Sequence, residues 1–65
     1  MNVGTGDLVR FKKRCRNFIE DYHMDADDVG LVVEMLELRL RGHRVIRVLH
    51  RGILAYVSEG DVEAV

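Results

Sequence analysis

Glycines divide the second half of the chain into short apolar runs that are rich in β-branched residues. Arg41-Gly42 closes the run "LVVEMLELRL", and Arg51-Gly52 separates "RVIRVLH" from "ILAYV". β-Branched residues favour strands, and a glycine-containing dipeptide between two such runs is typical of a tight hairpin turn. The pattern therefore predicts a meander of three antiparallel strands and an all-β fold.

The first of these runs, residues 31–40, changes phase along its length. Glutamate, methionine and leucine are good helix formers, but apolar residues alternate with other side chains as in a strand. Residues 31–35 alternate in one phase and residues 36–40 in the opposite phase. Because a β-bulge produces such a slip, we expect one long bent strand with a bulge near Met35 and Leu36.

The two ends of the chain supply the remaining strands. A Gly-Asp turn leads into a strand expected over Asp7–Lys12, and Ser58–Asp61 is typical of a 3₁₀ turn before a closing strand, Val62–Val65. Five short strands predict a small all-β domain. We expect its core to contain Leu8, Val9, Val32, Val48, Leu49, Val57 and Val62.

A long loop excursion, residues 13–28, follows the first strand. Phe18, Ile19 and Tyr22 are spaced so that one or two helical turns would place them on one apolar face. These side chains either extend the core or form an apolar anchor on the rim that docks a neighbouring protein. The sequence leaves both interpretations open.

The length of 65 residues indicates a single domain, residues 1–65. A chain this short buries a small core, and its one cysteine excludes an internal disulfide. Support from a partner or from self-association is therefore expected. The sequence has no signal-peptide pattern, and the free Cys15 suits a reducing compartment.

The charges are sorted into blocks although the net charge is −1. Residues 10–16 and 39–51 form basic blocks, and every charged residue from Glu20 to Glu37 is acidic. We expect acidic loops to lie against basic strands, within one molecule or between copies. The alternative is a basic stripe that binds nucleic acid. Its residues would be Arg10, Lys12, Lys13, Arg14, Arg44 and Arg47.

The sequence offers only weak candidates for catalytic or metal-binding motifs. Cys15 stands between two arginines, which would lower its pKa if it were exposed, but no pattern places a base beside it. His23 precedes the acidic residues 25–28, a sequence more typical of a solvated turn than of a cation site. No phosphate loop, zinc pattern or Ser-His-Asp spacing occurs. We therefore expect no enzyme activity, no cofactor and no metal site.

The order of these elements resembles an SH3-like barrel, and the ending is the more specific half. The start "GDLVRF", the strand "VGLVVEM" and the close "VLHRGILAYVSEGDVEAV" are similar to small SH3-like proteins of tailed phages. His50 stands where that pattern often has an aromatic residue, and Tyr56 stands where it often has tryptophan. The resemblance implies a virion component.

The first half also resembles a KOW module, a family that contacts RNA or partner proteins. Residues 6–9, "GDLV", and residues 30–33, "GLVV", carry this likeness. The acidic "DADDV" before Gly30 departs from the family pattern, because like charge repels phosphate.

Together these features predict a non-enzymatic protein–protein interaction module. The phage resemblance implies a capsid decoration protein or a neck or tail adaptor, present in multiple copies in the virion or made in the host cytoplasm. The alternatives are a KOW-like nucleic-acid-binding module and a small phage-encoded inhibitor of a host protein; no membrane association is expected. The predicted partner-binding residues are Phe18, Ile19 and Tyr22 for apolar contact, and Arg44, Arg47 and Arg51 for charge matching.

Overall fold

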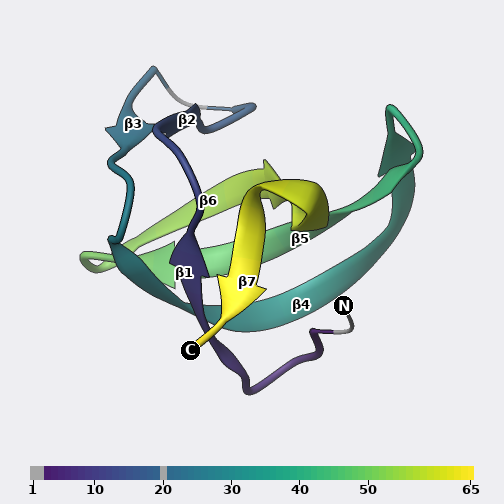
Figure 1. Cartoon of the computed structure of the whole chain (residues 1–65). Helices are drawn as coiled ribbons and strands as arrows, with labels where there is room; N and C mark the ends of the chain where they lie inside the picture. The colour runs from purple at the N-terminus through teal and green to yellow at the C-terminus, as the bar shows by residue number, and fades with distance from the viewer. Residues whose placement is uncertain (1–2, 20) are drawn as a thin grey trace.

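The computed structural model describes residues 3–19 and 21–65 and consists mainly of strands (Figure 1). The main antiparallel sheet has the strand order β6-β5-β4-β1-β7, and β2 and β3 form a separate pair. The elements are β1 (Leu8–Phe11), β2 (Cys15–Arg16), β3 (His23–Met24), β4 (Val29–Leu40), β5 (His43–His50), β6 (Ile53–Ser58), the 3₁₀ turn η1 (Glu59–Asp61) and β7 (Val62–Ala64).

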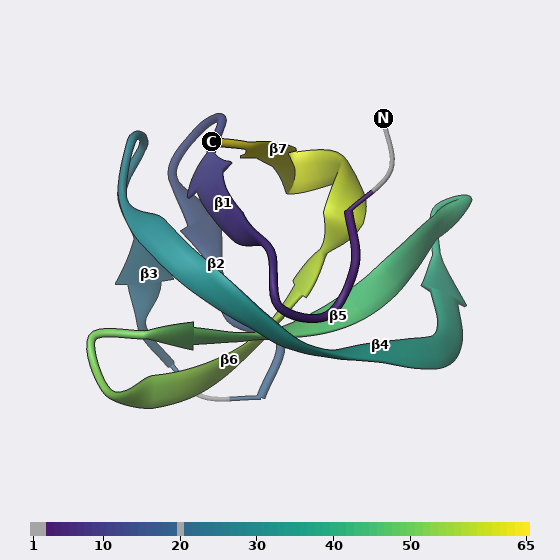
Figure 2. The same ribbon diagram turned by 90° about the horizontal axis from the view of Figure 1, so that it is seen from below.

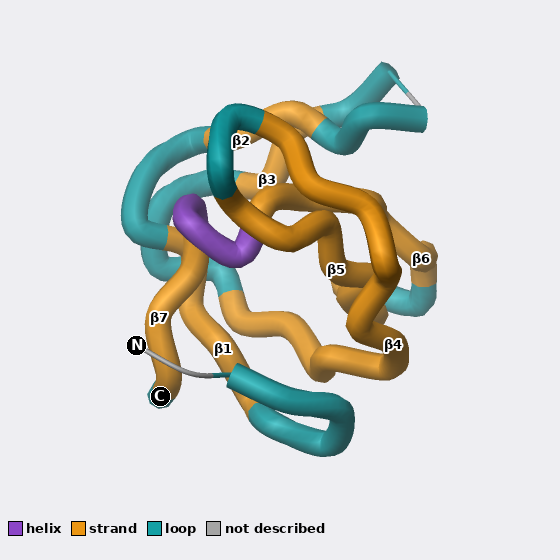
Figure 3. The backbone as a smooth tube through the Cα atoms, turned by 90° about the vertical axis from the view of Figure 1, so that its right-hand side faces the viewer, coloured by secondary structure: helices purple, strands orange, loops and turns teal. Residues whose placement is uncertain are grey.

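The predicted all-β fold with five main strands is confirmed. The sheet curls on itself, with β1 beside β7 at one end and β5 beside β6 at the other (Figures 1 and 2). The end strands β6 and β7 do not pair with each other, so hydrogen bonds do not close the barrel. They are joined in sequence by η1, at the position predicted for a 3₁₀ turn (Figure 3).

Both predicted hairpin turns are confirmed. Each contains two residues with positive φ: 54° and 83° at Arg41-Gly42, and 52° and 77° at Arg51-Gly52. Two consecutive left-handed residues define the tight turn whose twist matches that of paired strands. Glycine takes the second position at no steric cost, which explains why the same dipeptide recurs.

The long strand β4 bends as predicted. Its residues 29–31 pair with β1, and its length from Leu31 to Leu40 pairs with β5. The register shifts between Val32 and Glu34 and again between Met35 and Arg39, so a bulge lies near the predicted position. Beyond the second shift, β4 and β5 form an arm that projects from the curled sheet (Figures 1 and 2).

The core lies inside the curl and contains most of the residues expected there. Val9, Val32, Val48, Val57 and Val62 are buried. The prediction was wrong for Leu8 and Leu49, which are exposed on the opposite face of their strands. Successive side chains of a strand point to opposite faces, so Val9 and Phe11 point inward in β1, and Val48 does so in β5.

The excursion over residues 13–28 contains no helix among its described residues, so the possible short helix is wrong. Its backbone makes other hydrogen bonds instead: the Asn17 amide donates to the Tyr22 carbonyl, and the Phe18 amide donates to the Tyr56 carbonyl. Cys15 and Met24, which are register partners of β2 and β3, both join the core. The excursion is therefore an extra layer that covers the core from its open side.

Candidate functional site

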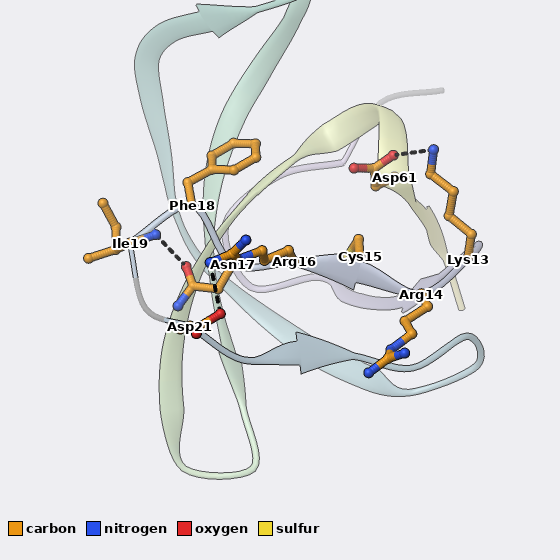
Figure 4. Close-up of a pocket in the computed structure, with 9 residues that line it drawn as sticks. All are labelled: Lys13, Arg14, Cys15, Arg16, Asn17, Phe18, Ile19, Asp21 and Asp61. Atoms are coloured by element: carbon orange, nitrogen blue, oxygen red, sulfur yellow. Dashed lines mark hydrogen bonds and ion pairs between the residues drawn. The ribbon is translucent and has the colours of Figure 1, made fainter.

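Two adjoining pockets, of about 530 and 480 Å³, lie on the surface around Phe18. They share Lys13, Phe18 and Asp61, and we call them together the Phe18 groove. The first pocket is lined mainly by the excursion (Figure 4). The second is lined by Leu40, Arg41 and His43 at the end of the β4–β5 arm and by Ser58 and Gly60 around η1.

A buried asparagine holds the excursion at the groove. The Asn17 Oδ1 atom accepts a hydrogen bond from the Tyr56 amide at 2.8 Å. It accepts a second one from the Ile19 amide at 3.2 Å (Figure 4). Asn17 is 2% exposed, whereas Phe18 and Ile19 are 44% and 69% exposed. Because Phe18 also bonds to Tyr56 through its own amide, a fixed backbone presents these two apolar side chains to solvent.

Tyr22, the third predicted apolar docking residue, points the other way. Its ring is stacked on the ring of His50, with 6.4 Å between centroids and 12° between planes, and it packs against the core. Each of the two interpretations therefore holds for part of this segment. Tyr22 extends the core, whereas Phe18 and Ile19 lie on the rim.

Ion pairs line the excursion side of the groove. Lys13 Nζ lies 3.7 Å from Asp61 Oδ1, and Arg16 Nη2 lies 2.8 Å from Asp21 Oδ1 (Figure 4). Arg14 Nε lies 3.6 Å from Asp25 Oδ1, on the neighbouring turn. These three cations of the first basic block are thus matched by carboxylates, as expected for acidic loops that lie against basic segments. Glu20, part of the acidic block, lies outside the described residues.

The three arginines predicted for charge matching also contact carboxylates of their own chain. Arg44 Nη2 lies 2.9 Å from Glu37 Oε1, and its Nε donates to the Leu36 carbonyl. Arg47 Nε lies 3.3 Å from Glu34 Oε1, and its guanidinium lies over the ring of Tyr56. Arg51 Nη2 lies 3.4 Å from Asp28 Oδ1.

Arg10 and Lys12, the two remaining cations of the proposed nucleic-acid stripe, differ in whether they contact a carboxylate. Arg10 contacts Glu63 at 3.1 Å and Asp27 at 3.9 Å. Within the described part of the chain, no carboxylate lies within ion-pair distance of Lys12 or of Arg41, which lines the groove. The structure therefore shows paired cations over most of the predicted stripe.

A histidine–aspartate pair inside the fold was missed by sequence reasoning. His50, which is 3% exposed, places Nε2 3.0 Å from Asp28 Oδ2. The hydrogen bond with His50, the Asp25 amide and the nearby Arg51 guanidinium hold the pKa of Asp28 below its ordinary value. The partners are 22 positions apart and no local pattern links them, although the sequence did show a histidine where aromatic residues are common.

His50 keeps the packing role of an aromatic residue. It meets the Phe11 ring edge-on, with 5.7 Å between centroids, in addition to the stacked ring of Tyr22. A planar ring with polar atoms can fill an aromatic position and also bond to a carboxylate. The pair therefore ties the end of the excursion to the β5–β6 hairpin.

Cys15 is buried rather than exposed between its flanking arginines. Burial is the largest cause that raises the pKa of its thiol, to about 11; Asp61 raises it further and Lys13 opposes the shift. A thiol in this state is mostly protonated at neutral pH, and a protonated thiol is a poor nucleophile.

The described residues contain no cluster of three or more metal-ligating side chains, and no helix among them is long and apolar enough to cross a membrane. Comparisons with protein-family models, with curated proteins and with solved structures give no match for this chain.

Proposed function

We propose that this chain is a non-enzymatic protein–protein interaction module whose partner docks in the Phe18 groove. The observation that carries this proposal is the presentation of Phe18 and Ile19 to solvent by a backbone that Asn17 ties to β6. Exposed apolar side chains that a fixed backbone holds lose little conformational entropy when a partner covers them. Aromatic side chains beside a pocket also supply much of the binding energy in protein interfaces.

The charges around the groove suggest the chemistry of the partner. Arg14 lines the first pocket and Arg41 lines the second, and Lys13 lines both and contacts Asp61. We propose that the partner inserts an apolar side chain beside Phe18 and places a carboxylate near Arg41. In this proposal Tyr22 supports the excursion from inside, and Arg44, Arg47 and Arg51 contribute charge matching secondarily, because a partner must compete with their internal carboxylates.

The buried positions of Cys15 and His50 support the non-enzymatic part of the proposal. The histidine–aspartate pair has the residue types of a catalytic dyad, but His50 lies in the core between Phe11 and Tyr22. From the resemblance to tailed-phage proteins alone, we further propose a virion adaptor or decoration role. Abundance in purified particles would test that role, and absence from particles would contradict it.

The experiment for the docking proposal uses the immobilised full chain and an extract of its source. We expect one or more proteins to bind the wild type and a Leu38→Thr control, and to be lost from Ile19→Asp and Phe18→Ser. Leu38 is an exposed leucine on β4 and does not line either pocket of the groove, so it controls for general apolar adhesion. Equal retention by all four proteins would contradict the proposal.

Nucleic-acid binding remains the rival. Most of its predicted residues contact carboxylates, which lowers the charge that they offer to phosphate. A gel shift at low salt that is lost when Arg44, Arg47 and Arg51 are changed to glutamate would favour the rival over the docking module.

A further inference from the structure

A continuous aliphatic row crosses the outer face of the main sheet, away from the Phe18 groove. Register pairs Leu8 with Leu31, Leu31 with Leu49, and Leu49 with Leu54, so one leucine from each of β1, β4, β5 and β6 lies on the same line. The Val65 amide donates to the Leu8 carbonyl and places Val65 at the end of this line. We call Val65, Leu8, Leu31, Leu49 and Leu54 the outer row.

Four of the five residues of the outer row are exposed in the single chain, and Leu31 is half-buried. Leu8 and Val65 are 55% and 73% exposed, and Leu49 and Leu54 are 38% and 41% exposed. The excursion does not cover them, because it contributes Cys15 and Met24 to the core on the other face. Strands that are apolar on both faces are typical of sheets that are covered on both sides, so the outer row indicates a missing layer.

Charged residues of both signs border the outer row on each side. On one side Arg10 contacts Glu63 and Asp27, and on the other Arg47 contacts Glu34. An anionic membrane or a nucleic acid selects a border with net positive charge, and neither border has one. A surface that meets a copy of itself instead requires borders that do not repel, and each of these borders supplies one cation together with at least one anion.

We infer that the occupant of the outer row is a second copy of this chain, in a two-fold contact centred on Leu31 and Leu49. The cores of homodimer interfaces are more apolar than those of other complexes, and this row contains no aromatic or charged residue. A two-fold axis parallel to the row would bring the border with Arg10 over the border with Glu34 of the second copy. Opposite charges would then meet across the contact.

The contact is expected to be weak. The molecule measures 23 × 23 × 19 Å, so its flat face is smaller than the roughly 800 Å² that each partner buries in a standard interface. The curl of the sheet also turns its end strands β6 and β7 away from the centre of the row (Figure 2). We therefore expect a dissociation constant on the order of 0.1 mM for the isolated chain.

Sedimentation equilibrium of the full chain, from about 10 µM to about 1 mM, tests this inference. We expect the wild type to show a monomer–dimer equilibrium and Leu49→Glu to weaken it at least tenfold. Leu54→Thr is the milder second variant, which decides the result if circular dichroism shows that Leu49→Glu is unfolded. Leu38→Glu and Ile19→Asp are exposed-site controls that should dimerise like the wild type.

A wild-type chain that stays monomeric at about 1 mM would overturn the inference. So would dimers that persist in folded Leu49→Glu and Leu54→Thr, and so would dimers lost only in Ile19→Asp, which would move the contact to the Phe18 groove. Binding of a monomeric wild type to phosphatidylcholine vesicles would assign the outer row to lipid and would likewise overturn it. Because the Ile19→Asp control separates the two surfaces, failure here leaves the proposed docking function standing.

Discussion

The inner and outer faces of the main sheet are both apolar along one line of residues, but they differ in what covers them. On the inner face Val9, Val48 and Ala55 are fully buried, and the excursion adds Cys15 and Met24 above them. On the outer face Leu8, Leu49 and Leu54 are each the immediate chain neighbour of one of these residues and remain exposed. Apolar character therefore does not distinguish the residues that hold this fold from those that are available to partners.

Gly30 lies on the inner face of the sheet, at a position with no room for a side chain. A Cβ atom on Gly30 would collide with Val48 Cγ1 and would lie 3.3 Å from the Leu49 carbonyl oxygen. β1 and β5 pack against β4 at this point, so the inner face of β4 has no room for a side chain. The comparison of the two faces can be tested by changing neighbours that differ only in the face they occupy.

The largest difference is expected between two residues of β1. Phe11→Ala should lower the free energy of unfolding by about 3–5 kcal/mol, because Phe11 is fully buried and packs on His50. Leu8→Ala should cost less than about 1 kcal/mol, because Leu8 is exposed in the single chain. Urea unfolding at low protein concentration measures the free energy of both variants. Similar losses for Phe11→Ala and Leu8→Ala would contradict the difference between the two faces.

Gly30→Ala should lower the free energy of unfolding by about 1–3 kcal/mol, because the added methyl group must displace Val48 or the backbone of β5. The matched control is Gly4→Ala, where nothing lies within 4 Å of the new atom. Adding Val48→Ala to Gly30→Ala should cost less than the sum of the two single changes, because the smaller side chain makes room. Strict additivity in thermal or urea unfolding would refute the close packing.

Asn17→Ala should lower the free energy of unfolding by about 1–3 kcal/mol, because it leaves the partly buried Tyr56 amide without its acceptor. The amides of Phe18, Ile19 and Tyr56 should then exchange with deuterium faster than those of β1. This result would show that the excursion opens separately from the sheet. Unchanged exchange at Tyr56 would mean that Asn17 does not hold the excursion.

The smallest effect is expected for a change at Asp28, which should alter how stability falls at acid pH. Its pKa in the fold lies below the ordinary value of 3.8, so its contribution to stability is present above that value and is lost as the pH falls through the folded pKa. Asp28→Asn should lower the melting temperature at neutral pH and flatten the further loss below about pH 4. Thermal melts across this range check the slope, and an unchanged acid limb would remove Asp28 from the account.

Much of the fold could be predicted from the sequence because its signals are local. The two Arg-Gly turns, the phase slip in β4 and the 3₁₀ turn each depend on a few adjacent residues. The assignment of faces failed at Leu8 and Leu49 because apolar neighbours make alternation ambiguous there. The pair of two-residue strands β2 and β3 is too short for any periodic pattern, so the excursion was open to a helical interpretation.

The candidate site was predictable in part. The exposure of Phe18 and Ile19 agrees with one of the two interpretations of their spacing, while Tyr22 follows the other. The roles of Asn17 and of the His50–Asp28 pair depend on residues 39 and 22 positions apart. Such contacts exist only after the chain has folded, and a single sequence carries no signal for them.

We propose that the exposed apolar residues serve docking, and we expect that they are not needed for folding. The most direct measurement is the free energy of unfolding, at low concentration, of a chain that carries Phe18→Ser, Ile19→Thr, Leu49→Thr and Leu54→Thr together. The account predicts a cooperative transition within about 2 kcal/mol of the wild type, together with loss of partner capture and of self-association. An unfolded variant, or a loss as large as that of Phe11→Ala, would contradict it.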